Sequence, residues 1–399
     1  MLTSQNRMIG LFALCYLVAA SWPVHGQHAL LSKKPVIVIT DLYHPYQDPG
    51  DNLDLIMGYA LPQVDLKAII LDITDAFRKD TADHPTLWRD PRGPREAGII
   101  PVNQLNYIFD RQVPYAIGPL MWMRSETDQM RDSGMLQQGI ALFLHTLAQS
   151  PEPVEVISFG SARVLAVAFN RDPGLLRKKI SLIHLSAGTA APDFRLGNDK
   201  GANSIPGGEW NVALDLYAFL RVLKSGLPIA LYPCAGVDGG FVKDVNNTYW
   251  KMPSLSFLKD IDPRLQRYID YALTQRQQVD YLKAMDVTGS FAPATARYPA
   301  PFHFWETDIW KNVAGLRLVQ SKAGNYLFRA AGMGQPGDVA VASSLQPVKL
   351  TIRKDGRFIF TRTAEPSAVR IYYRADPDLE ERALQQAYPA LLTSFKTHF

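Results

Sequence analysis

The sequence predicts an α/β fold: an open, mostly parallel sheet flanked by helices, with β-hairpin additions and a closing helix at the C-terminus. Short apolar, β-branched runs, such as residues 35–40 and 66–71, alternate with stretches of helical spacing. Such runs are typical of strands buried on both faces of a parallel sheet. The chain has 399 residues and is 47% hydrophobic, which is enough for a core of that size.

Composition and charge exclude several other classes of protein. The 42 basic and 38 acidic residues are interspersed and leave a net charge of +4. No block of basic residues is present, so we expect no nucleic-acid partner. Collagen-like and low-complexity compositions are excluded too. The two cysteines, Cys15 and Cys234, cannot form a disulfide scaffold.

The N-terminus has the order of a secretory signal peptide. A polar start ending in Arg7 is followed by an apolar run over 8–22, and then by the small residues Val24 and Gly26. We therefore expect residues 1–26 to be a signal peptide and residues 27–399 to be one exported domain, periplasmic or secreted. The apolar run is short for a membrane span, although an uncleaved anchor is the alternative. After cleavage we expect no membrane attachment.

Acidic residues follow the first two predicted strands. They are Asp41, Asp48, Asp51, Asp72 and Asp75. Ligands of open parallel sheets bind beyond the carboxyl ends of the strands. Several converging carboxylates require a positive charge among them, and an oxygen-only ligand set favours Ca²⁺ or Mg²⁺. The alternative is that some of these acids, and Asp54 in particular, cap helices or form turns.

This segment resembles the N-terminus of the nucleoside hydrolase (inosine–uridine-preferring) family. That family has a buried strand that runs into an Asp-x-Asp-Pro-Gly-x-Asp-Asp loop. Here Asp48-Pro49-Gly50 and Asp51 match the loop, and Asp41 resembles the first aspartate. The chain departs from the pattern through inserted residues 42–47 and through Asn52 in place of an aspartate. Which of Asp41 and Asp48 is the innermost carboxylate therefore stays open.

Two further segments carry the resemblance through the middle of the chain. The strand over 154–160 ends at the position of the family's backbone-carbonyl metal ligand, here Phe159, and Val164 replaces the asparagine of the following turn. The second segment has the family's spacing of Asn, Glu, Asn and Asp: Asn203, Glu209, Asn211 and Asp215.

The resemblance implies that Asn203, Glu209 and Asn211 bind ribose hydroxyls, where a carboxylate accepts a charge-assisted hydrogen bond. Asp75 and Trp210 are further candidates for substrate binding. The alternative for Glu209 and Asn211 is a polar loop that caps a helix. Asp215 is expected to cap the helix over 216–224.

The C-terminal third carries the last candidates. The family has a His-Asp-Pro helix start, with the aspartate on the metal and the histidine near the leaving base. Asp308 fits the aspartate and Thr307 stands in place of the histidine, so His303 is the candidate leaving-group acid, or else a packing residue. Three tryptophans either stack on a substrate or belong to the core. They are Trp210, Trp305 and Trp310.

Residues 316–375 are expected to form a β-rich extension. Alternating runs around Asp355-Gly356 predict one hairpin, and residues 323–325 predict the turn of another. A closing helix is expected over 376–395. The resemblance covers about residues 35–320.

The resemblance implies a hydrolase that cleaves the N-glycosidic bond of a small-molecule nucleoside or related ribosyl substrate with a Ca²⁺-bound water. Asp41 or Asp48 would be the general base. The implied metal ligands are Asp41, Asp48, Asp51, Phe159 and Asp308. The alternative, favoured by Asn52, Val164 and Thr307, is an exported sugar- or nucleoside-binding protein that keeps the metal site without turnover. A homo-oligomer is left open.

Overall fold

The computed structural model describes residues 33–44, 49–77, 95–132, 136–193, 209–274, 280–287 and 292–397. These residues lie in one compact unit, Lys33–Phe399. The predicted signal peptide, Asp48 and Asn203 lie outside the described residues.

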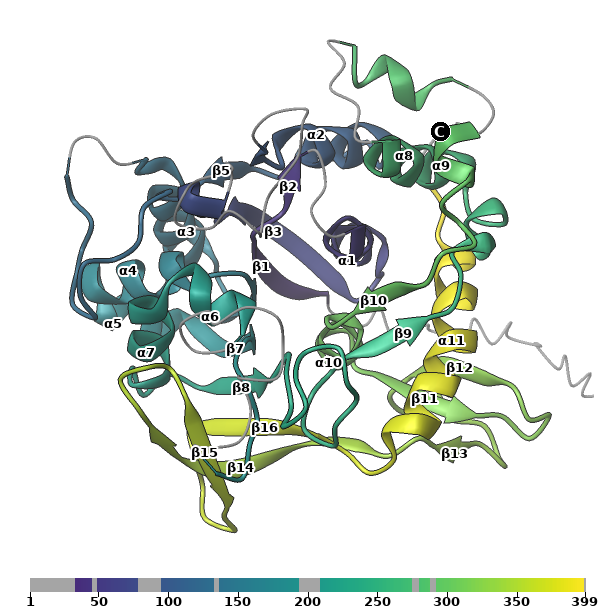
Figure 1. The fold of residues 1–399 in the computed structure, drawn as a ribbon. Helices are drawn as coiled ribbons and strands as arrows, with labels where there is room; N and C mark the ends of the chain where they lie inside the picture. The colour runs from purple at the N-terminus through teal and green to yellow at the C-terminus, as the bar shows by residue number, and fades with distance from the viewer. Residues whose placement is uncertain are drawn as a thin grey trace, which may run out of the picture. The chain divides into compact units, whose positions relative to one another are not determined.

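A nine-stranded sheet forms the centre of this unit, with the order β15-β14-β16-β8-β7-β6-β1-β3-β5 (Figure 1). Seven strands run parallel to one another: β1 (Lys34–Thr40), β3 (Val64–Leu71), β5 (Tyr115–Ile117), β6 (Val154–Phe159), β7 (Ile180–Ser186), β8 (Ile229–Tyr232) and β16 (Val369–Arg374). The other two, β14 (Ser343–Ile352) and β15 (Phe358–Arg362), are antiparallel. The predicted open, mostly parallel sheet is confirmed.

Helices cover both faces of the sheet, because alternate side chains of each strand point to opposite sides. Val36 and Val38 of β1 join one apolar cluster, and Ile37 and Ile39 join the other. The first cluster includes α1 (Pro49–Ala60), α2 (Ile99–Ile108), α8 (Pro263–Thr274), α10 (Thr307–Val313) and α11 (Pro377–Ser394). The second includes α3 (Gln138–Gln149), α4 (Arg163–Arg171), α5 (Pro173–Lys179) and α7 (Leu216–Leu223).

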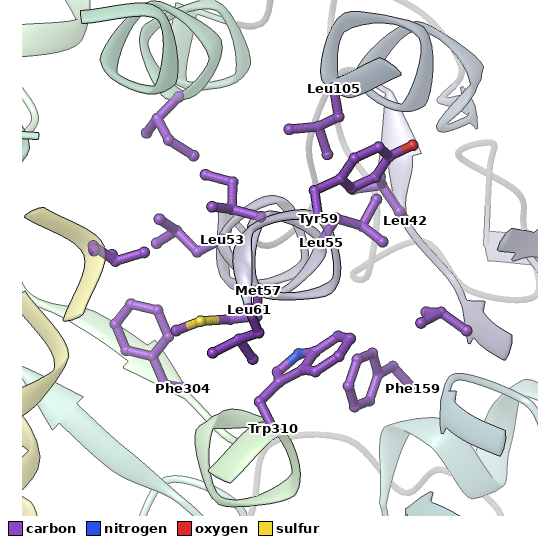
Figure 2. Packing of buried hydrophobic residues seen from close by; sticks show 14 of the residues in the cluster. Leu42, Leu53, Leu55, Met57, Tyr59, Leu61, Leu105, Phe159, Phe304 and Trp310 are labelled. Carbon is purple, nitrogen blue, oxygen red and sulfur yellow. The ribbon is translucent and has the colours of Figure 1, made fainter. Parts of the chain in front are cut away.

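Helix α1 lies at the centre of the first cluster (Figure 2). Trp310 packs beside it, and a Cβ added at Gly58 would come within 3.0 Å of the indole. The ring of Phe159 meets Trp310 edge-on, with 5.9 Å between centroids. Trp310 is 1% exposed, so of the two roles open for it the structure shows the core.

The predicted hairpins are present. Gly324 and Gly356 occupy their turns with φ of +88° and +84°, a conformation that favours glycine. The predicted β-rich extension divides between two sheets. Strands β14 to β16 lengthen the central sheet, while β11 (Leu316–Gln320), β12 (Tyr326–Ala330) and β13 (Val339–Ala340) form a separate one. Helix α11 follows with Asp376 as its N-cap, close to the predicted start.

Short elements complete the unit. They are the strand pairs β2 (Tyr43–His44) with β4 (Glu96–Ala97) and β9 (Trp250–Met252) with β10 (Phe302–Phe304), the helices α6 (Trp210–Leu214) and α9 (Ala292–Thr295), and the 3₁₀ turns η1 (Asp75–Phe77), η2 (Ser256–Lys259) and η3 (Lys283–Met285).

One capping prediction is wrong. Asp54 lies in the middle of α1, which already begins at Pro49, a residue whose fixed φ suits the first helical position. Among the described helices, none combines the length and the apolar character that crossing a bilayer would require.

Candidate functional site

The carboxyl ends of β1, β3, β6 and β7 meet at one edge of the sheet, and the candidate site is built there. Asp41 follows β1 and Asp72 follows β3, and the Asp72 amide donates to the Thr40 carbonyl over 2.8 Å. Asp41 is 4% exposed and Asp72 is fully buried. The structure therefore brings together two of the acids that the sequence placed at strand ends.

Asp41 lies in a strongly perturbed environment. Burial raises the pKa of its carboxyl to about 8, and the negative charges of Glu306 and Asp72 add to the rise. The indole N–H of Trp210 donates to Asp41 Oδ2 over 3.2 Å and acts in the opposite direction. A buried carboxylate close to other carboxylates demands a proton or a cation.

Glu306 is a candidate site residue that sequence reasoning missed. It immediately precedes α10 and is 9% exposed, and its Oε1 accepts from Ser186 Oγ over 3.0 Å. Ser186 Oγ also lies 3.2 Å from Cys234 Sγ. The sequence carries a signal for this residue, because two acids, Glu306 and Asp308, stand at the start of α10.

Asp308 is held by a cation from its own helix. It is fully buried and forms an ion pair with Lys311 Nζ, which also lies 3.3 Å from Glu380 Oε1. Burial lowers the pKa of Lys311, but the charges of Asp308 and Glu380 outweigh that effect and raise it. Beside Asp308, Thr307 Oγ1 accepts from the Trp250 indole over 3.1 Å.

Glu209 and Asn211 bond mainly to backbone. Glu209 is the N-cap of α6 and accepts from the amides of Gly188, Asn211 and Val212, at 2.7, 3.0 and 3.2 Å. Asn211 Nδ2 donates to the Ser186 carbonyl over 2.7 Å. Glu209 therefore has the helix-capping role that the sequence left open. Asp215 caps α7 as predicted, accepting from the Ala218 amide over 3.1 Å.

The other candidates lie on separate elements. Asp51 is in the first turn of α1, Asp75 begins η1, and Phe159 ends β6. His303 on β10 is half-buried, its Nδ1 lies 2.8 Å from the Tyr249 hydroxyl, and burial lowers its pKa. Trp305 Nε1 donates to the Cys234 carbonyl over 2.9 Å. Within the described part of the chain, no three His, Cys, Asp or Glu residues are grouped to hold a metal ion.

A buried arginine next to the site was also missed. Arg163 is fully buried and forms ion pairs with Asp215 at 2.9 Å and Asp72 at 3.8 Å. Its signal in the sequence is a single charge in the otherwise apolar helical run over 161–169.

The sequence of the chain is similar to that of a known ribonucleoside hydrolase. No family model matches the chain. The chain is 27% identical over 197 residues to the pyrimidine-specific ribonucleoside hydrolase RihA of Salmonella enteritidis, a match that covers 48% of this chain and 58% of that protein. The chain is therefore similar in sequence to a nucleoside hydrolase. This confirms the resemblance predicted from the motifs, although the match spans less than two thirds of the relative.

Solved structures of nucleoside hydrolases also align with the chain. The inosine-uridine preferring enzyme of Bacillus anthracis is 14% identical, with 88% of this chain and 97% of that chain covered and a TM-score of 0.46. The purine-preferring ribonucleoside hydrolase of Gardnerella vaginalis is also 14% identical, with 90% and 99% covered and a TM-score of 0.46.

Proposed function

We propose that this chain is a hydrolase that cleaves the N-glycosidic bond of a nucleoside or a related ribosyl substrate. The supporting observation is the pair of buried acids, Asp41 and Glu306, at the edge of the sheet where open parallel sheets bind their ligands. The similarity to a ribonucleoside hydrolase supports the same reaction class.

A calcium ion fits the donor chemistry of this edge. Asp41 and Glu306 offer carboxylate oxygens in a buried setting that favours a cation, and Asp48, Asp51 and the Phe159 carbonyl are the further proposed ligands. Asp308 fits less well, because Lys311 already neutralises it. When bound, Ca²⁺ would lower the pKa of a water and hold that water at the site.

Residues of the chain would supply proton transfer, stabilisation of the developing charge and contacts to the substrate. Asp41 accepts the proton of the attacking water, and the Trp210 indole fixes the orientation of its carboxylate. The transition state of glycosidic cleavage resembles an oxocarbenium ion, so the negative charges of Asp41 and Glu306 stabilise the sugar as it becomes positive. Asp75 and Asn203 remain the proposed contacts to the substrate, and His303 the proposed leaving-group acid.

A second candidate function is an exported sugar- or nucleoside-binding protein without turnover. It is favoured by Glu209, which caps α6, by Asn211, which donates to the Ser186 carbonyl, and by His303, whose Nδ1 lies 2.8 Å from the Tyr249 hydroxyl. Export itself is a proposal that rests on residues 1–26. N-terminal sequencing of protein recovered from the periplasm or the medium would test it, with Gln27 as the expected first residue.

The deciding experiment measures release of free base from purine and pyrimidine nucleosides, with Ca²⁺ or with EDTA. We expect turnover in Ca²⁺ that falls at least about a hundredfold in Asp41→Asn and in Glu306→Gln, since both remove groups at the reacting centre. The surface substitution Asp132→Asn, at a side chain that is 56% exposed, is the matched control. Calorimetric binding of a nucleoside without turnover would support the second candidate, whereas neither binding nor turnover would overturn both. Absence of calcium binding would overturn the metal assignment.

A further inference from the structure

We propose that Arg163 is a positioning residue, which holds helix α6 so that the Trp210 indole stays on Asp41. The placement rests on the geometry alone. Its effect on catalysis rests on the proposed function.

Every N–H group of the Arg163 guanidinium donates a hydrogen bond. An arginine has five N–H donors in a fixed planar fork, and each of them has an acceptor here. Nε donates to Asp215 Oδ2 over 2.9 Å. Nη1 donates to the Ile73 carbonyl over 3.2 Å and to the Pro119 carbonyl. Nη2 donates to the Leu214 carbonyl over 3.1 Å and to Thr74 Oγ1.

These acceptors come from three different segments. Ile73 and Thr74 follow β3, Pro119 follows β5, and Leu214 and Asp215 form the junction of α6 with α7. Arg163 itself begins α4, directly after β6 and after Ala162, which has a φ of +57°. One side chain therefore connects the loops that follow β3, β5 and β6 with the end of α6.

The hydrogen bond from Arg163 to the Leu214 carbonyl affects Asp41 through helix α6, which carries Trp210. This helix has five residues, with Trp210 at its first position and Leu214 at its last. So short a helix has little stability of its own and takes its position from its attachments. Glu209 fixes its N-terminal end on the Gly188 amide, and Arg163 fixes its C-terminal end. Thr74 Oγ1 strengthens the second attachment by donating to the Leu214 carbonyl over 3.0 Å.

Arg163 also places a positive charge among the acids of this edge. It pairs with Asp72, one of the two acids whose charges act on Asp41. Lysine could keep the charge but not the planar fork, because its ammonium cannot span acceptors on three segments. The role therefore depends on the shape of the arginine as well as on its charge.

The test observes Trp210 directly and needs no activity. The full chain is labelled with 5-fluorotryptophan, and the ¹⁹F resonance of Trp210 is assigned by its disappearance in Trp210→Phe. The variants are Arg163→Met and the more conservative Arg163→Lys, which keeps the test informative if the first does not fold. The matched control is Arg374→Met. Arg374 is equally buried, but it donates to Asp244, Asn247 and Tyr249, which lie outside α6.

We expect the Trp210 resonance to shift or broaden in both Arg163 variants and to stay in place in Arg374→Met. An unchanged Trp210 resonance in a folded Arg163 variant would overturn the proposal, as would an equal shift in Arg374→Met. In either case Arg163 would be a general stabiliser of the fold.

A double-mutant cycle on the kinetics of Arg163→Lys and Trp210→Phe adds a second readout if the chain turns over nucleosides. Misplacement of a catalytic group costs on the order of tenfold to a hundredfold in rate. We therefore expect Arg163→Lys to lower kcat by that factor with a smaller change in KM, and to have less than about a twofold effect in the Trp210→Phe background. Equal effects in both backgrounds would contradict a role through Trp210. If no turnover occurs, the proposed function fails while the ¹⁹F result still decides the role of Arg163.

Discussion

Buried acids at the carboxyl edge of the sheet differ in the charges that surround them. Asp72 and Asp215 share the guanidinium of Arg163. Asp41 receives an indole N–H, and the charges that act most strongly on it within the described residues belong to two other acids. Where the chain supplies its own cation, the acids hold the fold together. The carboxyl of Asp41 instead has a raised pKa and would be stabilised by a proton or a cation. Raised pKa values of this kind are common at functional sites.

A second internal cation shows that the contrast is not a matter of burial. Asp308 and Glu380 are as deeply buried as Asp72, and they are paired with Lys311. Acids near a strand end or a helix start thus divide into those paired with a cation of the chain and those, such as Asp41, on which other acids act most strongly. Burial alone and proximity in sequence do not separate them.

The largest effect is expected from removing the internal cation. Arg163→Met leaves two buried carboxylates without their partner, and breaking a buried ion pair from one side costs about 3–5 kcal/mol. Urea denaturation of the two proteins measures the free energy of unfolding. Arg124→Met, at a pair whose arginine is 64% exposed, is the control and should cost far less, because solvent screens an exposed ion pair. A loss at Arg163 as small as that of the control would remove the contrast.

Asp41→Asn should change stability in the opposite direction. In EDTA, above the raised pKa of about 8, wild type carries a buried charge next to Glu306 that the variant lacks. We expect the variant to be more stable by about 1–3 kcal/mol, the usual cost of an uncompensated buried polar group. In Ca²⁺ the order should reverse, because only wild type gains free energy from binding. Thermal unfolding in the two buffers measures both. A loss of stability in EDTA would place Asp41 with the structural acids.

Much of the fold could be predicted from local sequence. The continuous apolar run of β1 has both its faces buried, and glycines at 324 and 356 mark their turns, because each signal lies within a few residues. The join of β16 to β8 could not be predicted in this way. It pairs Val369 with Ile229, far apart in the chain, and rests on tertiary packing.

The site was predictable only where its signal is local. The end of β1 identified Asp41 as a buried acid at the edge of the sheet. Of the two roles open for Glu209, the structure shows the helix cap, and the Asn211 side chain donates to the Ser186 carbonyl. Glu306 meets Ser186 across 120 residues, and Arg163 meets Thr74 across 89. Partners so distant cannot be found from spacing, so the roles of Glu306 and Arg163 emerge only in three dimensions.

The smallest effect is expected where an aspartate pairs with an arginine that is exposed to solvent. The hydrogen bond from Arg124, with those of the Arg124 and Met130 amides, lowers the pKa of Asp128 to about 2 from an ordinary 3.8. A lowered pKa means that this contribution is present above about pH 4 and is lost as the pH falls toward 2. Because Arg124 is largely exposed and screened by solvent, we expect Asp128→Asn to cost less than about 1 kcal/mol at neutral pH. Urea denaturation of both proteins between pH 2 and pH 5 should show the difference shrinking toward acid. A difference that stays constant, or one as large as that of Arg163→Met, would mean that exposure is not what separates this pair from the buried one.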